Sequence, residues 1–107
     1  MTTSESSGLA LKLDAAQIQT RMQKLSGWTL EYAPTIAKTW TFASFDDAVE
    51  TFNQIAQLAR AQDHHPEIVS SYTRLQVRIW THDAAGLTDK DFKLASRIDA
   101  LLAQQRV

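Results

Sequence analysis

The chain contains no cysteine among its 107 residues. Disulfide bonds, thiolate nucleophiles and cysteine-ligated zinc sites are therefore excluded, and the absence fits a reducing cytoplasm. No apolar stretch approaches the ~20 residues that a membrane-spanning helix requires. The first eight residues also lack the basic and apolar pattern of a secretory signal. We therefore expect a cytoplasmic protein that does not associate with a membrane.

Charge of one sign is also lacking, because 11 Lys and Arg stand against 12 Asp and Glu. Nucleic-acid binders show a basic excess, so no nucleic-acid partner is expected. There is no glycine-rich phosphate loop and no recognisable nucleophile motif around a serine or threonine. The length suits one domain, and 44% apolar residues suffice for an ordinary core. We expect residues 1–10 to be flexible and residues 11–107 to form that domain.

The spacing of apolar residues predicts the element order α-ββ-α-ββ-α. Helices are expected after Asp14, Ser44 and Thr88, because each of these capping residues is followed three positions later by Gln or Asp. Alternating side chains in residues 28–42 and 67–82 predict two hairpins. The simplest arrangement is an α+β fold, a four-stranded antiparallel sheet with the three helices packed on one face.

The second helix leads directly into the most informative segment. Its apolar stripe is predicted to comprise Val49, Phe52, Ile55, Ala56 and Ala59. The helix must stop near residue 62, because Pro66 disfavours helical backbone at His65. Residues 63–67, with the sequence Asp-His-His-Pro-Glu, therefore form a loop between a helix and a strand.

Histidine is the side chain best suited to move protons near neutral pH. Neighbouring histidines on extended backbone point in opposite directions, so His64 and His65 are poor joint ligands for one metal ion. They could instead line different walls of one pocket. Strand alternation places His82 on the same face as Trp80, whose flat ring could stack on a ligand. Two imidazoles across a flat ligand could catalyse an elimination or a tautomerisation.

Simpler interpretations of the same residues stay open at this point. A His-His pair in a loop is more often solvated than catalytic. Asp63 and Asp83 each neighbour a histidine and either could orient an imidazole ring, but His82 with Asp83 could equally stabilise a turn. A metal site built from the histidines and a carboxylate matches no strong zinc spacing.

Several separated segments together resemble the pterin-4a-carbinolamine dehydratase family. The resemblance is carried by residues 63–67, Tyr72, residues 81–88, Asp91 and residues 94–96, with Gly27 and Trp28 near the first helix, and it covers the chain from about Leu11. Two positions depart from the family pattern. Arg60 stands where the family usually carries glutamate or another polar ionisable residue, and Lys90 stands where arginine is frequent.

The resemblance implies an enzyme that removes water from 4a-hydroxytetrahydrobiopterin, in pterin recycling after aromatic amino-acid hydroxylation. It implies His64 and His82 as general acid and base, with His65 positioning the pterin. Substrate-binding residues would be Asp63, Pro66, Trp80, Thr81, Asp83 and Lys90. No metal or cofactor is expected, and the family implies a homodimer or homotetramer. Two alternatives are a non-catalytic dimerisation or assembly module of the same fold, and a dehydratase of molybdopterin metabolism.

Overall fold

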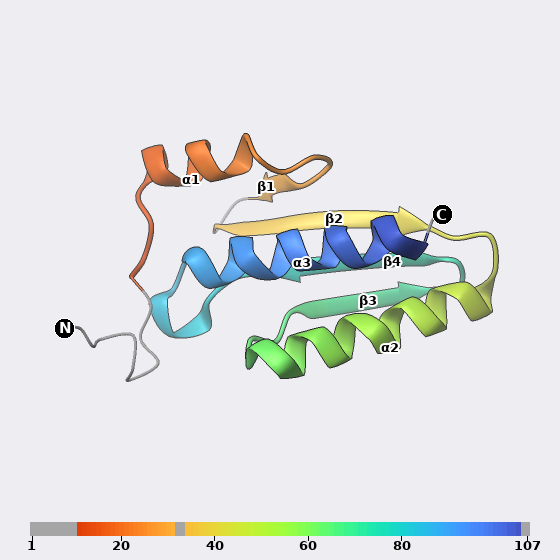
Figure 1. The fold of residues 1–107 in the computed structure, drawn as a ribbon. Coiled ribbons are helices and arrows are strands. Elements are labelled where there is room, and N and C mark those ends of the chain that lie inside the picture. The colour runs from red at the N-terminus through yellow and green to blue at the C-terminus, as the bar shows by residue number, and fades with distance from the viewer. Residues whose placement is uncertain (1–10, 32–33, 106–107) are drawn as a thin grey trace.

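The computed structural model describes residues 11–31 and 34–105, and the expected flexible segment 1–10 lies outside them. The elements follow the predicted order (Figure 1): α1 (Ala15–Met22), β1 (Thr29–Glu31), β2 (Thr35–Thr41), α2 (Phe45–Gln62), β3 (Glu67–Ser71), β4 (Arg74–Ile79), the short 3₁₀ helix η2 (His82–Ala84) and α3 (Asp89–Gln105). Within this part of the chain, no helix has the length and apolar character needed to cross a bilayer.

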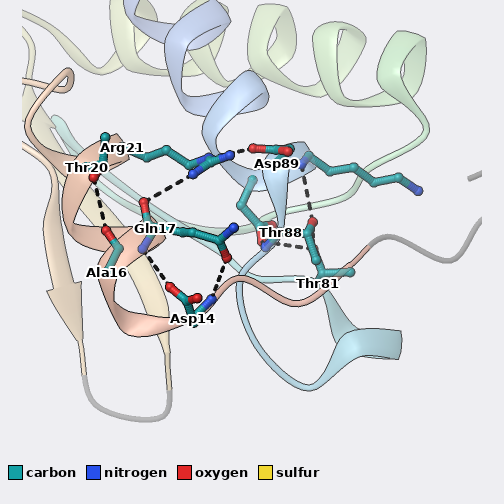
Figure 2. A network of polar contacts seen from close by, with 10 residues as sticks. Asp14, Ala16, Gln17, Thr20, Arg21, Thr81, Thr88 and Asp89 are labelled. Carbon is teal, nitrogen blue, oxygen red and sulfur yellow. Dashed lines mark hydrogen bonds and ion pairs between the residues drawn. The ribbon is translucent and has the colours of Figure 1, made fainter.

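All three predicted helix starts are confirmed, and side chains at each one satisfy backbone N–H groups. At α1, Asp14 and Gln17 form a reciprocal capping box, drawn in Figure 2. At α2, the Ser44 hydroxyl accepts the N–H of Asp47 at 3.0 Å. At α3, the Thr88 hydroxyl accepts the N–H two residues later at 3.2 Å. These bonds occupy donors that a helix terminus otherwise leaves unpaired.

The four strands form one antiparallel sheet in the order β1-β2-β4-β3. Register pairs Ile36 of β2 with Ile79 of β4, so both side chains project to the same face. That face meets the helices in one core. Its buried members include Ile36, Leu75, Val77 and Ile79 from the sheet and Ile18, Ile55, Leu94 and Ile98 from the helices. The predicted fold class is therefore confirmed, with all three helices covering one face of the sheet.

The buried side of α2 differs from the predicted stripe. Val49 is 37% exposed, whereas Ala48 and Thr51 are buried together with the expected Ile55 and Ala59. The Thr51 hydroxyl donates to the carbonyl of Asp47 at 2.8 Å, so its burial leaves no unpaired polar group. Small residues let the helix approach the sheet closely, and hydrophobicity alone cannot indicate this.

A partly buried cluster joins α3 to the first hairpin. The Asp99 carboxylate accepts the indole N–H of Trp28 at 2.9 Å and pairs with the Lys38 ammonium at 3.0 Å. The Lys38 ammonium also lies 5.3 Å from the centre of the Trp40 ring. One carboxylate therefore connects α3 to two side chains of the first hairpin that lie 61 and 71 positions away in the sequence.

We expect Asp99→Ala to lower the free energy of unfolding by about 1.5–3 kcal/mol, because hydrogen bonds to a charged group are lost. Asp89→Ala is the matched control. Its pair with Arg21, drawn in Figure 2, is shorter, at 2.6 Å. The Asp89 side chain, however, is 74% exposed. Water screens an exposed pair, so the control should lose about 1 kcal/mol or less. Urea denaturation of both variants measures the two losses in free energy of unfolding. Equal losses would show that burial does not decide how much each carboxylate contributes to stability.

Candidate active site

The candidate site lies at one end of the sheet, where α2 ends, β3 begins, β4 ends and α3 begins (Figure 1). A cavity of about 400 Å³ opens there, a volume within the usual range for small-molecule sites. Its lining consists of Asp63, His64, His65, Trp80, Thr81, His82, Asp83 and Lys90. Every site residue expected from the sequence is thus brought together except Pro66, which does not line the cavity.

Two larger cavities occur elsewhere in the described part of the chain. One, of about 460 Å³, is lined by residues of β2, α2 and α3, including Trp40 and Glu50. The other, of about 710 Å³, lies between α1 and the first hairpin. Neither contains a histidine. The side chains best suited to proton transfer near neutral pH therefore lie at the smaller cavity, which cavity volume alone does not indicate.

The backbone holds His64 at the end of α2. The helix closes with Asp63 in the left-handed conformation, at φ +53°, which aspartate tolerates better than most residues. The N–H of Asp63 then bonds to the carbonyl of Arg60, and that of His64 to the carbonyl of Ala59, both at 3.1 Å. This is the paired pattern of a Schellman cap. The predicted end of the helix is confirmed, and the cap fixes where His64 leaves it.

The partner of His64 is a buried carboxylate on α3. Nε2 of His64 lies 2.6 Å from Oδ1 of Asp91; the histidine side chain is 10% exposed and that of Asp91 is 0% exposed. The other carboxylate oxygen accepts the Thr81 hydroxyl at 2.8 Å and the Thr88 N–H at 2.9 Å. A buried carboxylate is costly unless it is fully hydrogen-bonded, and here both oxygens are engaged.

The sequence did not identify this pairing. It suggested that an adjacent aspartate, Asp63 or Asp83, could orient a histidine, but the carboxylate that contacts His64 is Asp91, 27 positions away. The sequence marked Asp91 as the capping partner of Thr88, three residues before it, and as one of the residues that carry the family resemblance, but not as a partner of His64. The Asp91 carboxylate thus caps the start of α3 and also contacts His64. Only the packing of α3 beside the end of α2 reveals the contact with His64.

His82 reaches the cavity by a different route from the predicted one. The strand ends at Ile79, and Thr81 instead forms an isolated bridge with Gly86, whose carbonyl accepts the Thr81 N–H at 2.8 Å. His82 then begins η2, which closes with Ala85 at φ +53°. The expected strand placement of His82 is therefore wrong. A turn closed by the Thr81 bridge, rather than alternation along a strand, positions the ring.

The three imidazoles occupy unlike environments. His64 is buried and paired, whereas His65 and His82 are exposed at the cavity. Within the described residues, no group of three or more His, Asp or Glu side chains is arranged to hold a metal ion. The alternative of a metal site built from the histidines and a carboxylate therefore finds no support in the geometry of these residues. The arrangement suits proton transfer by one oriented imidazole and one solvated imidazole on a ligand between them.

Comparison with known proteins agrees with this geometry. Residues 11–101 match the family model described as "Pterin 4 alpha carbinolamine dehydratase". The chain belongs to this family. A relative from Paracidovorax citrulli is 42% identical over 94 residues, covering 85% of this chain and 81% of the relative. One from Sulfurisphaera tokodaii is 38% identical, covering 85% of this chain and 97% of the relative. Both bear the name "Putative pterin-4-alpha-carbinolamine dehydratase".

Solved structures share the dehydratase fold. A transcriptional coactivator/pterin dehydratase from Brucella melitensis superposes with a TM-score of 0.80 at 30% identity, covering 84% of this chain and 97% of that one. A second structure, a pterin dehydratase-like protein identified as a RuBisCO assembly factor in the alpha-carboxysome, gives a TM-score of 0.60 at 22% identity, covering 71% of this chain and 89% of that one. The second likeness concerns the fold alone.

Proposed function

We propose that this protein dehydrates 4a-hydroxytetrahydrobiopterin to quinonoid dihydropterin and water by histidine acid-base catalysis. The observation that carries the proposal is the single cavity lined by His64, His65 and His82, in a chain of the pterin-4a-carbinolamine dehydratase family. Elimination of water leaves the oxidation state of the substrate unchanged. Proton transfer is therefore the main chemical task of the site, and imidazoles are suited to it.

The reaction needs one group to accept a proton and one to donate a proton. The proton on N5 of the pterin must leave while the 4a-hydroxyl departs as water. We assign these two tasks to His64 and His82, and we assign His65 to holding the pterin. Trp80 offers a flat surface for the ring system, and Asp63, Asp83 and Lys90 supply polar groups at the rim. Residues 11–107 would act as one domain.

The alternative of an assembly module has a precedent in the α-carboxysome protein identified as a RuBisCO assembly factor. Two features of this chain favour catalysis. All three histidines line the cavity, and a fully buried carboxylate is retained to orient one of them. A module that only binds a partner needs neither feature. Dehydration of another pterin, such as one of molybdopterin metabolism, would use the same acid-base chemistry. The identity of the substrate therefore distinguishes that pathway from pterin recycling.

The remaining expectations belong to the same proposal. We propose that the protein acts in the cytoplasm and that its substrate is the pterin product of aromatic amino-acid hydroxylases. We also expect a homodimer or homotetramer, since a domain of this size gains stability by association.

The direct experiment follows dehydration of 4a-hydroxytetrahydrobiopterin by stopped-flow absorbance, with and without the protein. We expect saturable acceleration over the spontaneous reaction, and weaker acceleration with pterins that carry other side chains. The His64→Gln/His82→Gln double variant at equal concentration controls for non-specific buffering. A wild-type rate equal to the spontaneous rate would contradict the proposal and favour the assembly module. Faster turnover of a molybdopterin-type substrate would instead reassign the pathway.

A further inference from the structure

Two buried threonine hydroxyls connect the start of α3 to the carboxylate that contacts His64. Oγ1 of Thr81 lies 2.7 Å from Oγ1 of Thr88 and 2.8 Å from Oδ2 of Asp91. The Thr88 hydroxyl also accepts the backbone N–H of Lys90 at 3.2 Å. Figure 2 shows the contact between the two threonines. Thr81 is 6% exposed and Thr88 is 0% exposed, so both residues are largely shielded from water.

The donor in each of these bonds follows from counting protons. A carboxylate only accepts, so the single hydroxyl proton of Thr81 must point to Asp91. The bond between the two hydroxyls must then be donated by Thr88. That direction agrees with the backbone N–H of Lys90, which can only donate to Thr88. The proton order therefore runs from the α3 backbone through both hydroxyls and ends on Oδ2 of Asp91.

The same ordering determines which nitrogen of His64 carries hydrogen. Oδ2 of Asp91 already accepts the Thr81 hydroxyl and the Thr88 N–H. Oδ1 then accepts from Nε2 of His64 at 2.6 Å. Among the described residues no hydrogen bond reaches Nδ1 of His64, and Nδ1 is not one of the buried polar atoms left without a partner. Nδ1 therefore has no hydrogen-bond partner among the described residues, in a side chain that lines the cavity.

We propose that Thr81 is a positioning residue: through Asp91 its hydroxyl holds neutral His64 in the Nε2–H form, which leaves the lone pair of Nδ1 facing the ligand. The family resemblance implied a substrate-binding role for Thr81. Its hydroxyl proton is committed to Asp91, however, so it orients the imidazole rather than donating to a ligand. The assignment of the tautomer stands on the hydrogen-bond geometry alone; only its catalytic consequence rests on the proposed dehydratase function.

For dehydration, a bare Nδ1 makes His64 the base. The N5–H proton passes to Nδ1 while its bonding electrons form the C4a=N5 double bond. The C4a–O bond breaks, and the hydroxyl leaves as water after taking a proton from His82. The imidazolium formed at His64 faces the Asp91 carboxylate, which stabilises the charge, as the aspartate does in a Ser-His-Asp triad. The proton taken by His64 and the proton given by His82 balance over one turnover.

The test is to remove the hydroxyl while keeping the shape. In Thr81→Val, Oδ2 of Asp91 loses one donor and the Thr88 hydroxyl loses its acceptor. We expect ¹⁵N NMR of the His64 ring at alkaline pH, where imidazole is neutral, to show only the Nε2–H form in the wild type. The valine variant should show a mixture with the Nδ1–H form. Turnover should fall about tenfold, in the range typical for groups that orient an imidazole, with KM changed by less than about twofold.

Thr81→Ser is the matched control, because it keeps the hydroxyl and should restore both the tautomer and the turnover. If the valine variant does not fold, Thr81→Ala provides the same test. An Nδ1–H form in the wild type would overturn the proposal, and so would an unchanged tautomer in the valine variant or a serine variant as impaired as valine. A shifted tautomer in a protein that shows no dehydratase activity would leave the positioning role standing and remove only the proposed function.

Discussion

Replacing His64 by glutamine should lower kcat/KM for carbinolamine dehydration by about 10²–10⁴-fold, the usual contribution of one acid-base group. Glutamine keeps an N–H donor that can bond to Oδ1 of Asp91, but it cannot take up a proton. The loss should therefore come from the missing proton transfer rather than from a disturbed fold. His82→Gln should fall in the same range, because the departing hydroxyl would lose its proton donor.

His64→Ala separates catalysis from stability. Alanine removes one of the three donors to a fully buried carboxylate, and a buried polar group that loses its partner costs about 1–3 kcal/mol. We expect the alanine variant to unfold at much lower urea concentration than the glutamine variant, although both lose activity.

His65→Gln is the control for position in the cavity. It should raise KM more than it lowers kcat, because His65 is assigned to holding the pterin. Full activity of His64→Gln would contradict the assignment of His64.

Asp91→Ala should have the largest effect on stability among single substitutions at the site. Three donors lose their acceptor at once: the imidazole of His64, the hydroxyl of Thr81 and the N–H of Thr88. Each unpaired buried donor costs about 1–3 kcal/mol. We therefore expect a loss of about 3–5 kcal/mol, a large part of the 5–15 kcal/mol that stabilises a typical domain. Urea denaturation measures it.

Asp91→Asn keeps the volume and removes the charge. The amide must turn its NH₂ group toward one of the three donors, so at least one bond is lost and His64 can adopt the other tautomer. In serine proteases the same change in the buried aspartate lowers kcat by about 10⁴. Because proton transfer is the only task proposed for His64, we expect kcat to fall by about 10²-fold or more. Asp83→Asn is the control. Asp83 lines the same cavity but is exposed, so its stability should change by less than about 0.5 kcal/mol. Equal effects at both positions would contradict the role of Asp91.

The sequence predicted the fold well because its signals are local. Capping residues such as Asp14 and Ser44 act within three positions, and apolar alternation acts within one strand. The stripe of α2 was misplaced at Val49, because close packing favoured Ala48 and a threonine whose hydroxyl is satisfied by its own helix. That outcome depends on the distance between helix and sheet, which no local pattern encodes.

The site was only partly predictable for a related reason. The histidines were found because their residue type carries the chemistry. The turn that carries His82 was missed, because the strand pattern continues past Ile79 in the sequence while the chain already closes on Gly86. Asp91 was missed as a partner of His64 because the two meet only when α3 packs beside the end of α2. Tertiary contacts decide such pairs, and their sequence separation leaves no periodic signal.

The most direct test of the central claim is a single-turnover measurement of 4a-hydroxytetrahydrobiopterin dehydration by the wild type and by the His64→Gln/His82→Gln double variant. The proposed mechanism predicts rapid dehydration by the wild type and a rate close to the spontaneous one for the double variant, with pterin binding retained. Equal rates for the two proteins, both well above the spontaneous rate, would contradict it, because the histidines would then not move the protons.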